Sequence, residues 1–126
     1  MKKLLLLLFL IPNLAQSLEW VKVPISEEFY IDTSRAKKID GYLYYWAVRN
    51  NLEPDSMGIL STLRYYQSDC KMSKIKYLKM SFYTERMAKG SLLGTKNDPN
   101  SEWEYLTPNS TIEFVHDTAC LILHTK

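Results

Sequence analysis

Two cysteines, Cys70 and Cys120, are the residues of this chain best suited to covalent chemistry. They are the only cysteines among its 126 residues, and in an oxidising compartment two cysteines have one intramolecular pairing. A bridge between them would close a loop of about 50 residues and stabilise the fold by about 4 kcal/mol in the chain-entropy view. The alternatives are two buried free thiols or a metal pair, although His116 and His124 provide a poor zinc spacing. We predict the disulfide.

The other polar side chains form no recognised catalytic pattern. The chain lacks Gly-x-Ser-x-Gly, His-Glu-x-x-His and a glycine-rich phosphate loop. His116 and Asp117 are adjacent, but successive residues diverge by about 100° on a helix, so we expect His116 on a helix surface. Glu102 and Glu104 could share a strand face, where paired acids are usually solvated. We therefore expect no enzyme, no cofactor and no metal site, with a small hydrolase as the minor alternative.

The formal net charge of +2 arises from the beginning of the chain. Residues 1–17 contain Lys2 and Lys3 and no acid, and the remainder contains 14 basic and 14 acidic side chains. A neutral body argues against a dedicated nucleic-acid binder, which is usually strongly basic. We expect a protein partner and no nucleic acid.

The charge of the remainder is divided along the sequence. Residues 62–89 carry seven bases and two acids, whereas residues 97–117 carry five acids and no base. On a strand Lys74 and Lys76 should point the same way and Lys79 the opposite way. A basic surface interleaved with tyrosines would suit an acidic protein or a polyanion. The candidate binding patch consists of Arg64, Lys74, Lys76, Tyr77, Arg86 and Lys89.

Two other interpretations of these charges stay open. Lysines solubilise a protein and protect exposed edge strands from unwanted pairing. Alternatively, the basic and acidic blocks could pair with each other, either within the fold or across a homodimer.

Residues 1–17 have the pattern of a secretory signal peptide. Lys2 and Lys3 precede an unbroken apolar run over residues 4–11, and the small residues Ala15 and Ser17 follow. The run is shorter than the roughly 20 residues of a transmembrane helix. We predict a signal peptide over 1–17 and one domain over 18–126, without a transmembrane span, in the periplasm, at the cell surface or secreted. A retained helix is the alternative, and no lipobox cysteine lies near the cut.

The residue pattern of the remaining chain predicts mainly strands. Alternating apolar and aromatic residues separated by short polar links favour antiparallel pairing. Residues 90–100 contain Gly94, Asn97 and Pro99 and should form an exposed loop. The expected strands cover residues 20–23, 29–32, 41–49, 59–69 and 75–83.

In the C-terminal segment, the spacing of apolar residues changes from the alternation of a strand to that of a helix. Ser110 and Glu113 fit the capping box that begins a helix, and an apolar stripe follows. We predict a helix over about 111–121, with a terminal strand through 121–124 as the alternative. The expected fold is α+β: a meander-like antiparallel sheet of about five to six strands, with the helix packed on one face and pinned by the disulfide. Trp20, Trp46 and Trp103 should fill the core, although they could line a ligand groove.

Several short fragments occur in an order that is typical of one family. The fragments are Glu19-Trp20-Val21, Phe29-Tyr30-Ile31-Asp32, a strand ending in Trp46, Arg49-Asn50-Asn51, Ser61 eight residues before Asp69-Cys70, Met87-Ala88-Lys89-Gly90, Trp103, Pro108-Asn109-Ser110 and Ala119-Cys120. With these fragments in this order and both cysteines at matching places, the chain over about residues 19–121 resembles the surface-adhesin protein E family of small exported bacterial proteins.

The resemblance implies a single domain in which a disulfide ties a C-terminal helix to an antiparallel sheet. It also implies a cell-envelope or surface protein that binds host matrix or serum proteins such as vitronectin and laminin. The adhesin that gives the family its name is lipid-anchored, whereas this chain has no lipobox cysteine. A periplasmic accessory or structural protein without a host ligand is the alternative function.

Overall fold

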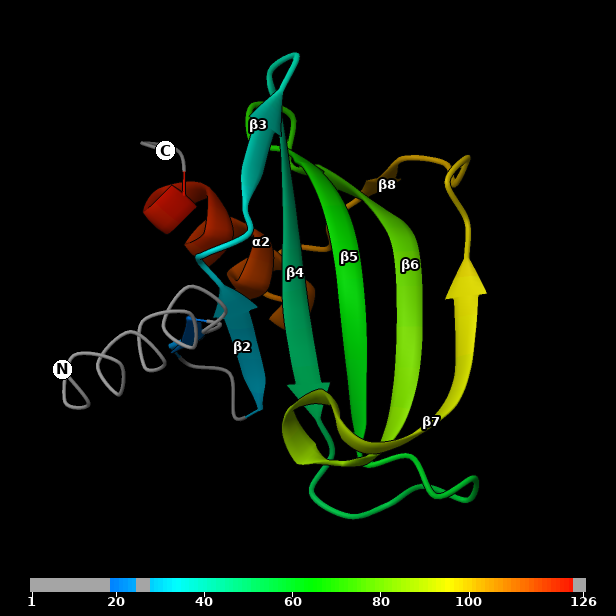
Figure 1. Ribbon diagram of the computed structural model, residues 1–126. Helices are drawn as coiled ribbons and strands as arrows, with labels where there is room; N and C mark the ends of the chain where they lie inside the picture. The colour runs from blue at the N-terminus through cyan, green and yellow to red at the C-terminus, as the bar shows by residue number, and fades with distance from the viewer. Residues whose placement is uncertain (1–18, 25–27, 124–126) are drawn as a thin grey trace, which may run out of the picture.

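Eight strands form one antiparallel sheet in this computed structural model, which describes residues 19–24 and 28–123. The path through the sheet is β1-β2-β4-β5-β6-β7, while β3 pairs with β4 and β8 pairs with β6. Helix α2 (Thr111–Leu123) lies behind the sheet in Figure 1. The predicted signal peptide falls outside the described residues. The strands are β1 (Trp20–Lys22), β2 (Phe29–Asp32), β3 (Lys37–Ile39), β4 (Tyr42–Asn50), β5 (Ser61–Asp69), β6 (Lys74–Glu85), β7 (Lys89–Asn97) and β8 (Glu104–Tyr105).

The predicted fold class is confirmed, and each predicted strand has a counterpart in β1, β2, β4, β5 or β6. The exposed loop predicted over 90–100 is wrong, because β7 runs through most of it and pairs with β6. Nearly all β7 residues are exposed, so no apolar alternation marked the strand. The short strand β3 also escaped prediction, although the two-residue turn Asp40-Gly41 that joins it to β4 is a typical hairpin connection.

A β-bulge in β6 changes which lysines share a face. Tyr66 pairs with Tyr77 and Tyr65 pairs with Lys79, so the β5–β6 ladder skips Leu78. The additional residue resets the alternation of side chains along the strand. Lys76 and Lys79 consequently lie on the same face of the sheet, and the prediction that Lys79 points away from Lys74 and Lys76 is wrong.

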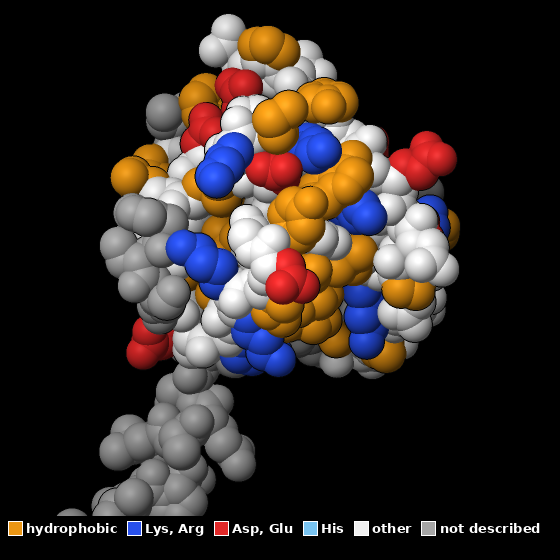
Figure 2. Space-filling model, turned by 90° about the horizontal axis from the view of Figure 1, so that it is seen from above, with side chains coloured by type: hydrophobic (Ala, Val, Ile, Leu, Met, Phe, Trp, Pro, Cys, Tyr) orange, Lys and Arg blue, Asp and Glu red, His pale blue; other side chains and the backbone are white. Residues whose placement is uncertain are grey.

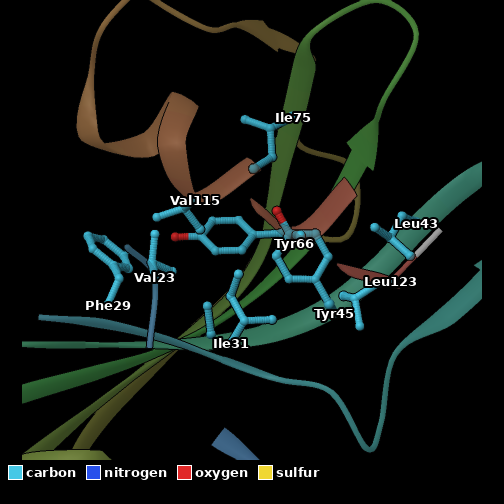
Figure 3. Packing of buried hydrophobic residues seen from close by; sticks show 11 residues of the cluster. Val23, Phe29, Ile31, Leu43, Tyr45, Tyr66, Ile75, Val115 and Leu123 are labelled. Atoms are coloured by element: carbon cyan, nitrogen blue, oxygen red, sulfur yellow. The ribbon is translucent and has the colours of Figure 1, made fainter. Parts of the chain in front are cut away.

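The hydrophobic core lies between α2 and the rear face of the sheet. Tyr45 and Tyr66 are fully buried there, with ring centroids 5.5 Å apart. Figure 3 shows Val115 and Leu123 from the helix meeting these rings and Leu43. Burying each large apolar side chain stabilises the fold by roughly 1.5–3 kcal/mol. Because side chains alternate along a strand, the residues between these buried ones point to the front face of the sheet.

Helix α2 begins where the capping residues predict. The Ser110 hydroxyl accepts a hydrogen bond from the Glu113 N–H at 3.2 Å, and the Glu113 carboxylate accepts one from the Asn109 N–H at 2.9 Å. The helix continues to Leu123, two residues beyond the predicted end, so residues 121–123 do not form the alternative strand. Within the described ranges, no helix is long and apolar enough to cross a membrane.

The predicted disulfide between Cys70 and Cys120 is present, with the two Cα atoms 5.9 Å apart. Cys70 directly follows β5, and Cys120 lies in the last turns of α2. At 13 residues α2 is near the length at which isolated helices are only marginally stable in water. Its packing and this covalent bond therefore hold it in place.

The lower end of the front face of the sheet is covered by η1 (Arg86–Ala88), which crosses β4 and β5 (Figure 1). The Met87 N–H donates a hydrogen bond to Asn50 Oδ1 at 2.7 Å, and the Ala88 N–H donates one to Ser61 Oγ at 3.0 Å. Asn50 and Ser61 are buried as a result. The upper part of the front face stays clear of this segment.

Replacing both cysteines with alanine should lower the free energy of unfolding by about 4 kcal/mol, because the unfolded chain regains the entropy of a loop of about 50 residues. Urea unfolding at neutral pH checks this value. The reduced wild-type protein is the matched control and should unfold at the same urea concentration as the variant. A loss below about 1 kcal/mol for both proteins would show that the bond contributes little.

Candidate functional site

Aromatic side chains line the upper front face of the sheet. Leu43, Tyr45 and Ala47 of β4 point to the rear core, so the alternating residues of the same strand point forward. Trp46 stacks on Tyr65 of β5 with ring centroids 4.5 Å apart, and Tyr44 lies 6.3 Å from the same Tyr65 ring. The result is a half-buried row of rings across two central strands.

Cationic side chains surround this row. Lys74 Nζ and Lys76 Nζ each lie 4.9 Å from the centre of the Trp103 ring, which is 5.2 Å from Tyr42. On the other side, the Arg35 guanidinium lies 5.3 Å from the Trp46 ring. We call this surface the aromatic–cationic face. It consists of Tyr42, Tyr44, Trp46, Tyr65 and Trp103 together with Arg35, Lys74, Lys76 and, through the bulge, Lys79.

Figure 2 looks down on the end of the molecule where β4 begins and shows hydrophobic side chains with Lys and Arg side chains beside them and some Asp and Glu side chains among them. A cation over an aromatic ring is attracted by the negative face of the ring, an interaction of about 0.5–1 kcal/mol at exposed sites. Trp103 therefore holds Lys74 and Lys76 close to one another despite their like charge.

The basic and acidic blocks of the sequence are neighbours in space but form no ion pair with each other among the described residues. Backbone pairing places Glu104 opposite Ile75 and Tyr105 opposite Lys74. The ion pairs of the described residues instead join Arg86 of the basic block to Glu28 and, outside both blocks, Arg35 to Asp32. The lysines of the aromatic–cationic face thus retain charge that can act on a partner.

Arg35 is positioned by a buried carboxylate. Asp32 accepts hydrogen bonds from the Ser34 N–H at 2.9 Å and the Ser34 hydroxyl at 2.7 Å, and it forms the ion pair with Arg35. Burial raises the pKa of Asp32, but the bonds from Ser34 and Arg35 outweigh burial and hold the pKa below its ordinary value. The carboxylate therefore stays charged and fixes the turn that carries Arg35 to Trp46.

The structure brings together only part of the predicted binding patch. Lys74 and Lys76 lie together on the front face, whereas the β5–β6 register places Arg64 and Tyr77 on the rear face. Burial raises the pKa of Tyr77 to about 12. Arg86, the first residue of η1, is ion-paired with Glu28, and Lys89 is exposed at the start of β7. The six residues do not form one surface.

Arg64 instead lines a cavity of about 880 Å³ near the beginning of α2. Its guanidinium lies 5.6 Å from the centre of the Phe29 ring and donates a hydrogen bond to the Tyr66 hydroxyl at 3.1 Å. Arg49, Glu53 and Ile112 also line the cavity. Because both arginines belong to the rear side, they cannot cooperate with Lys74 and Lys76 in one contact.

Two expectations about individual side chains are wrong. The three tryptophans predicted to fill the core, Trp20, Trp46 and Trp103, are all partly exposed. Trp46 and Trp103 lie on the front face, because the rear core is filled by Tyr45, Tyr66 and smaller residues. His116 is only 1% exposed and faces the sheet, so it is no helix-surface residue. The described residues contain no cluster of His, Cys, Asp or Glu able to hold a metal ion.

Sequence reasoning missed several members of the aromatic–cationic face. The alternation of Tyr42, Tyr44 and Trp46 was visible and marked one face of a strand. No local sequence pattern indicated that Trp103, far along the chain, would lie against that face. No local pattern indicated that a bulge would turn Lys79 toward it either.

The fold and this face define a small α+β domain in which a disulfide fixes one helix behind a sheet whose front face presents rings and cations. The chain belongs to the surface-adhesin protein E family, whose model matches residues 20–121. This confirms the resemblance found in the sequence. No curated protein sequence matches the chain.

Solved structures of protein E from Haemophilus influenzae have a similar fold. One has a TM-score of 0.62 at 16% identity, and the match covers 85% of this chain and 87% of that chain. Its crystal form II has a TM-score of 0.63 at 16% identity, covering 83% and 89%. Protein E from non-typeable Haemophilus influenzae has a TM-score of 0.61 at 17% identity, covering 81% and 75%. At these identities the likeness establishes the fold alone.

Replacing Asp32 with asparagine should lower the free energy of unfolding at pH 7 by about 1–3 kcal/mol. Because the folded pKa lies below the unfolded value of about 3.9, the carboxylate contributes stability above that value and loses it as pH falls through the folded pKa. The difference between D32N and wild type should therefore shrink over a series of pH values that falls from about pH 5 through the folded pKa. Urea unfolding over this series tests it, with D98N as an exposed control. A difference independent of pH would contradict the assignment.

Proposed function

We propose that this protein is an adhesin-like binding protein of the cell envelope that recognises acidic segments of a protein partner through its aromatic–cationic face. The observation that carries the proposal is the placement of Lys74 and Lys76 over Trp103, where neither lysine forms an ion pair with any carboxylate of the residues that the structure describes. Membership of a family of surface adhesins supports a role in binding. Host matrix or serum proteins such as vitronectin and laminin are the partners that we propose to test.

The chemistry of the face suits such a partner. Aromatic rings provide large contact areas with little side-chain entropy to lose, and the lysines attract carboxylates from a distance. Because the rings are held by contacts with one another, much of the surface is organised before a partner arrives. Binding through exposed charges should weaken as the salt concentration rises, since salt screens such charges.

Reversing the charge of Lys74 and Lys76 together should weaken binding to vitronectin, laminin or heparin at low salt by at least about tenfold, because attraction becomes repulsion. Surface plasmon resonance at several salt concentrations measures the effect. K89E/K96E carries the same change of net charge on β7, outside the aromatic–cationic face, and should bind nearly as wild type does.

Both variants should keep the wild-type melting temperature, because all four lysines are at least partly exposed. Equal weakening by the two variants would point to net charge alone. Unchanged binding by K74E/K76E would contradict the proposal that the partner binds at the aromatic–cationic face.

The location that the proposal requires is tested separately. We expect residues 1–17 to be removed on export, leaving a chain that begins near residue 18, and mass spectrometry of the protein from intact cells measures that mass. Protease treatment of intact cells should then degrade the protein if it is displayed at the surface. Protection until the outer membrane is opened would favour the periplasmic accessory function and exclude contact with host matrix.

A further inference from the structure

A line of buried polar groups connects the sheet to the disulfide. The Tyr45 hydroxyl lies 3.0 Å from Ser68 Oγ, and Ser68 Oγ lies 3.1 Å from His116 Nδ1. On the other side of the same imidazole, Nε2 lies 3.7 Å from Cys120 Sγ. Tyr45, Ser68 and His116 are all almost completely inaccessible to solvent. A histidine four residues before a cysteine on a helix is well placed for this contact.

The chemistry of the sulfur sets the direction of these hydrogen bonds. A sulfur in a disulfide carries no proton and can only accept, so a hydrogen bond at Nε2 requires that this nitrogen carry the proton. In the neutral imidazole Nδ1 is then an acceptor, and the Ser68 hydroxyl donates a hydrogen bond to it. Ser68 Oγ in turn accepts from the Tyr45 hydroxyl. Every donor in the line thus points toward Cys120.

The imidazole is kept neutral by its surroundings. Burial lowers the pKa of His116, while Asp117, Asp69 and Glu113 act weakly in the opposite direction. Burial also raises the pKa of the Tyr45 hydroxyl, which therefore keeps its proton. The neutral form with a proton on Nε2 is the one that donates to sulfur.

The two cysteines of the bridge differ in their surroundings. Cys70 is an exposed residue in the turn after β5 and precedes the exposed Lys71, whose charge attracts anions. Cys120 is partly buried on α2, where Nε2 of His116 can donate to its sulfur. In thiol–disulfide exchange a thiolate attacks one sulfur and the other leaves, and a stabilised leaving thiolate departs faster.

We propose that the Cys70–Cys120 disulfide is a directional exchange site for an external thiolate, with Cys70 as the attacked sulfur and Cys120 as the leaving sulfur. The incoming thiolate forms a bond to Cys70 Sγ, and the Sγ–Sγ bond breaks with its electron pair remaining on Cys120. The resulting Cys120 thiolate accepts the hydrogen bond from His116 Nε2–H. The product is a mixed disulfide on Cys70, and in the reverse step the Cys120 thiolate attacks Cys70 Sγ and the external group leaves as a thiolate.

The attacking group is defined by its chemistry as a thiolate. A small-molecule thiol or the nucleophilic cysteine of a thiol–disulfide oxidoreductase could supply it. His116 is a positioning residue in this scheme, because it acts on the sulfur without forming or breaking a covalent bond. The proposal is independent of the aromatic–cationic face and would survive if that face bound nothing.

Reduced glutathione is the probe for the full-length oxidised protein. Exchange at about pH 8 is stopped with iodoacetamide, and peptide mass spectrometry locates the glutathione and the alkylated cysteine. We expect adducts with glutathione on Cys70 and a free, alkylated Cys120 to exceed the reverse arrangement by about tenfold. Equal amounts of both adducts, or an excess on Cys120, would overturn the proposal.

Variants separate this role from a loss of stability. H116F removes the donor and should slow exchange at Cys70 by about tenfold, whereas Y45F should slow it by about twofold because it removes only the far end of the line. V115A is the matched control, since truncating the buried Val115 destabilises the same helix while the His116 side chain is kept. Destabilisation exposes the bond, so V115A should exchange at least as fast as wild type.

A small molecule and an oxidoreductase are distinguished by adding thioredoxin in place of glutathione. A much larger ratio of wild-type to H116F rates with thioredoxin would favour the enzyme as the natural attacking group, and equal ratios would favour a small thiol. If H116F exchanges as fast as V115A with both reagents, the imidazole has no role in the exchange and the proposal fails.

Discussion

The attachment of α2 to the rear of the sheet is the constraint on which the rest of the structure depends. An isolated helix of 13 residues is marginal in water, so its formation requires the apolar contacts of Val115, Ala119 and Leu123. The bond between Cys70 and Cys120 keeps α2 close to the sheet when these apolar contacts open transiently. Beneath it, His116 satisfies its polar atoms within the interface, where an unpaired nitrogen would be costly.

Helix α2 covers the rear face of the sheet, which holds the core. Among the described residues, η1 covers the front face at one end, and the half-buried rings and cations lie at the other. Rings that are amphipathic and half-buried suit such a face, because their contacts with each other replace part of a core. The family shares the scaffold, whereas binding depends on side chains that a fold need not conserve.

The local sequence predicts much of the fold. Alternation along β4 and β5, the hydroxyl and acid of Ser110 and Glu113, and the presence of only two cysteines identify strands, a helix start and a disulfide. The strand and helix signals depend on residues that are close in the sequence, and two cysteines allow only one intramolecular pairing. The candidate site was predicted in part: Lys74 and Lys76 belong to it, while Arg64, Tyr77, Arg86 and Lys89 do not.

The sequence by itself therefore determined the class of fold, the covalent link and the aromatic strand at its centre, because these follow from periodicity and cysteine count. Tertiary structure decided the rest. Pairing with β6 made a strand of a segment rich in turn residues, and one skipped residue, Leu78, moved Lys79 to the other face. Packing against Ser68 buried His116, and a distant segment returned Trp103 to the front of the sheet. Contacts between residues far apart in the chain leave no local pattern, and only the folded sheet brings them together.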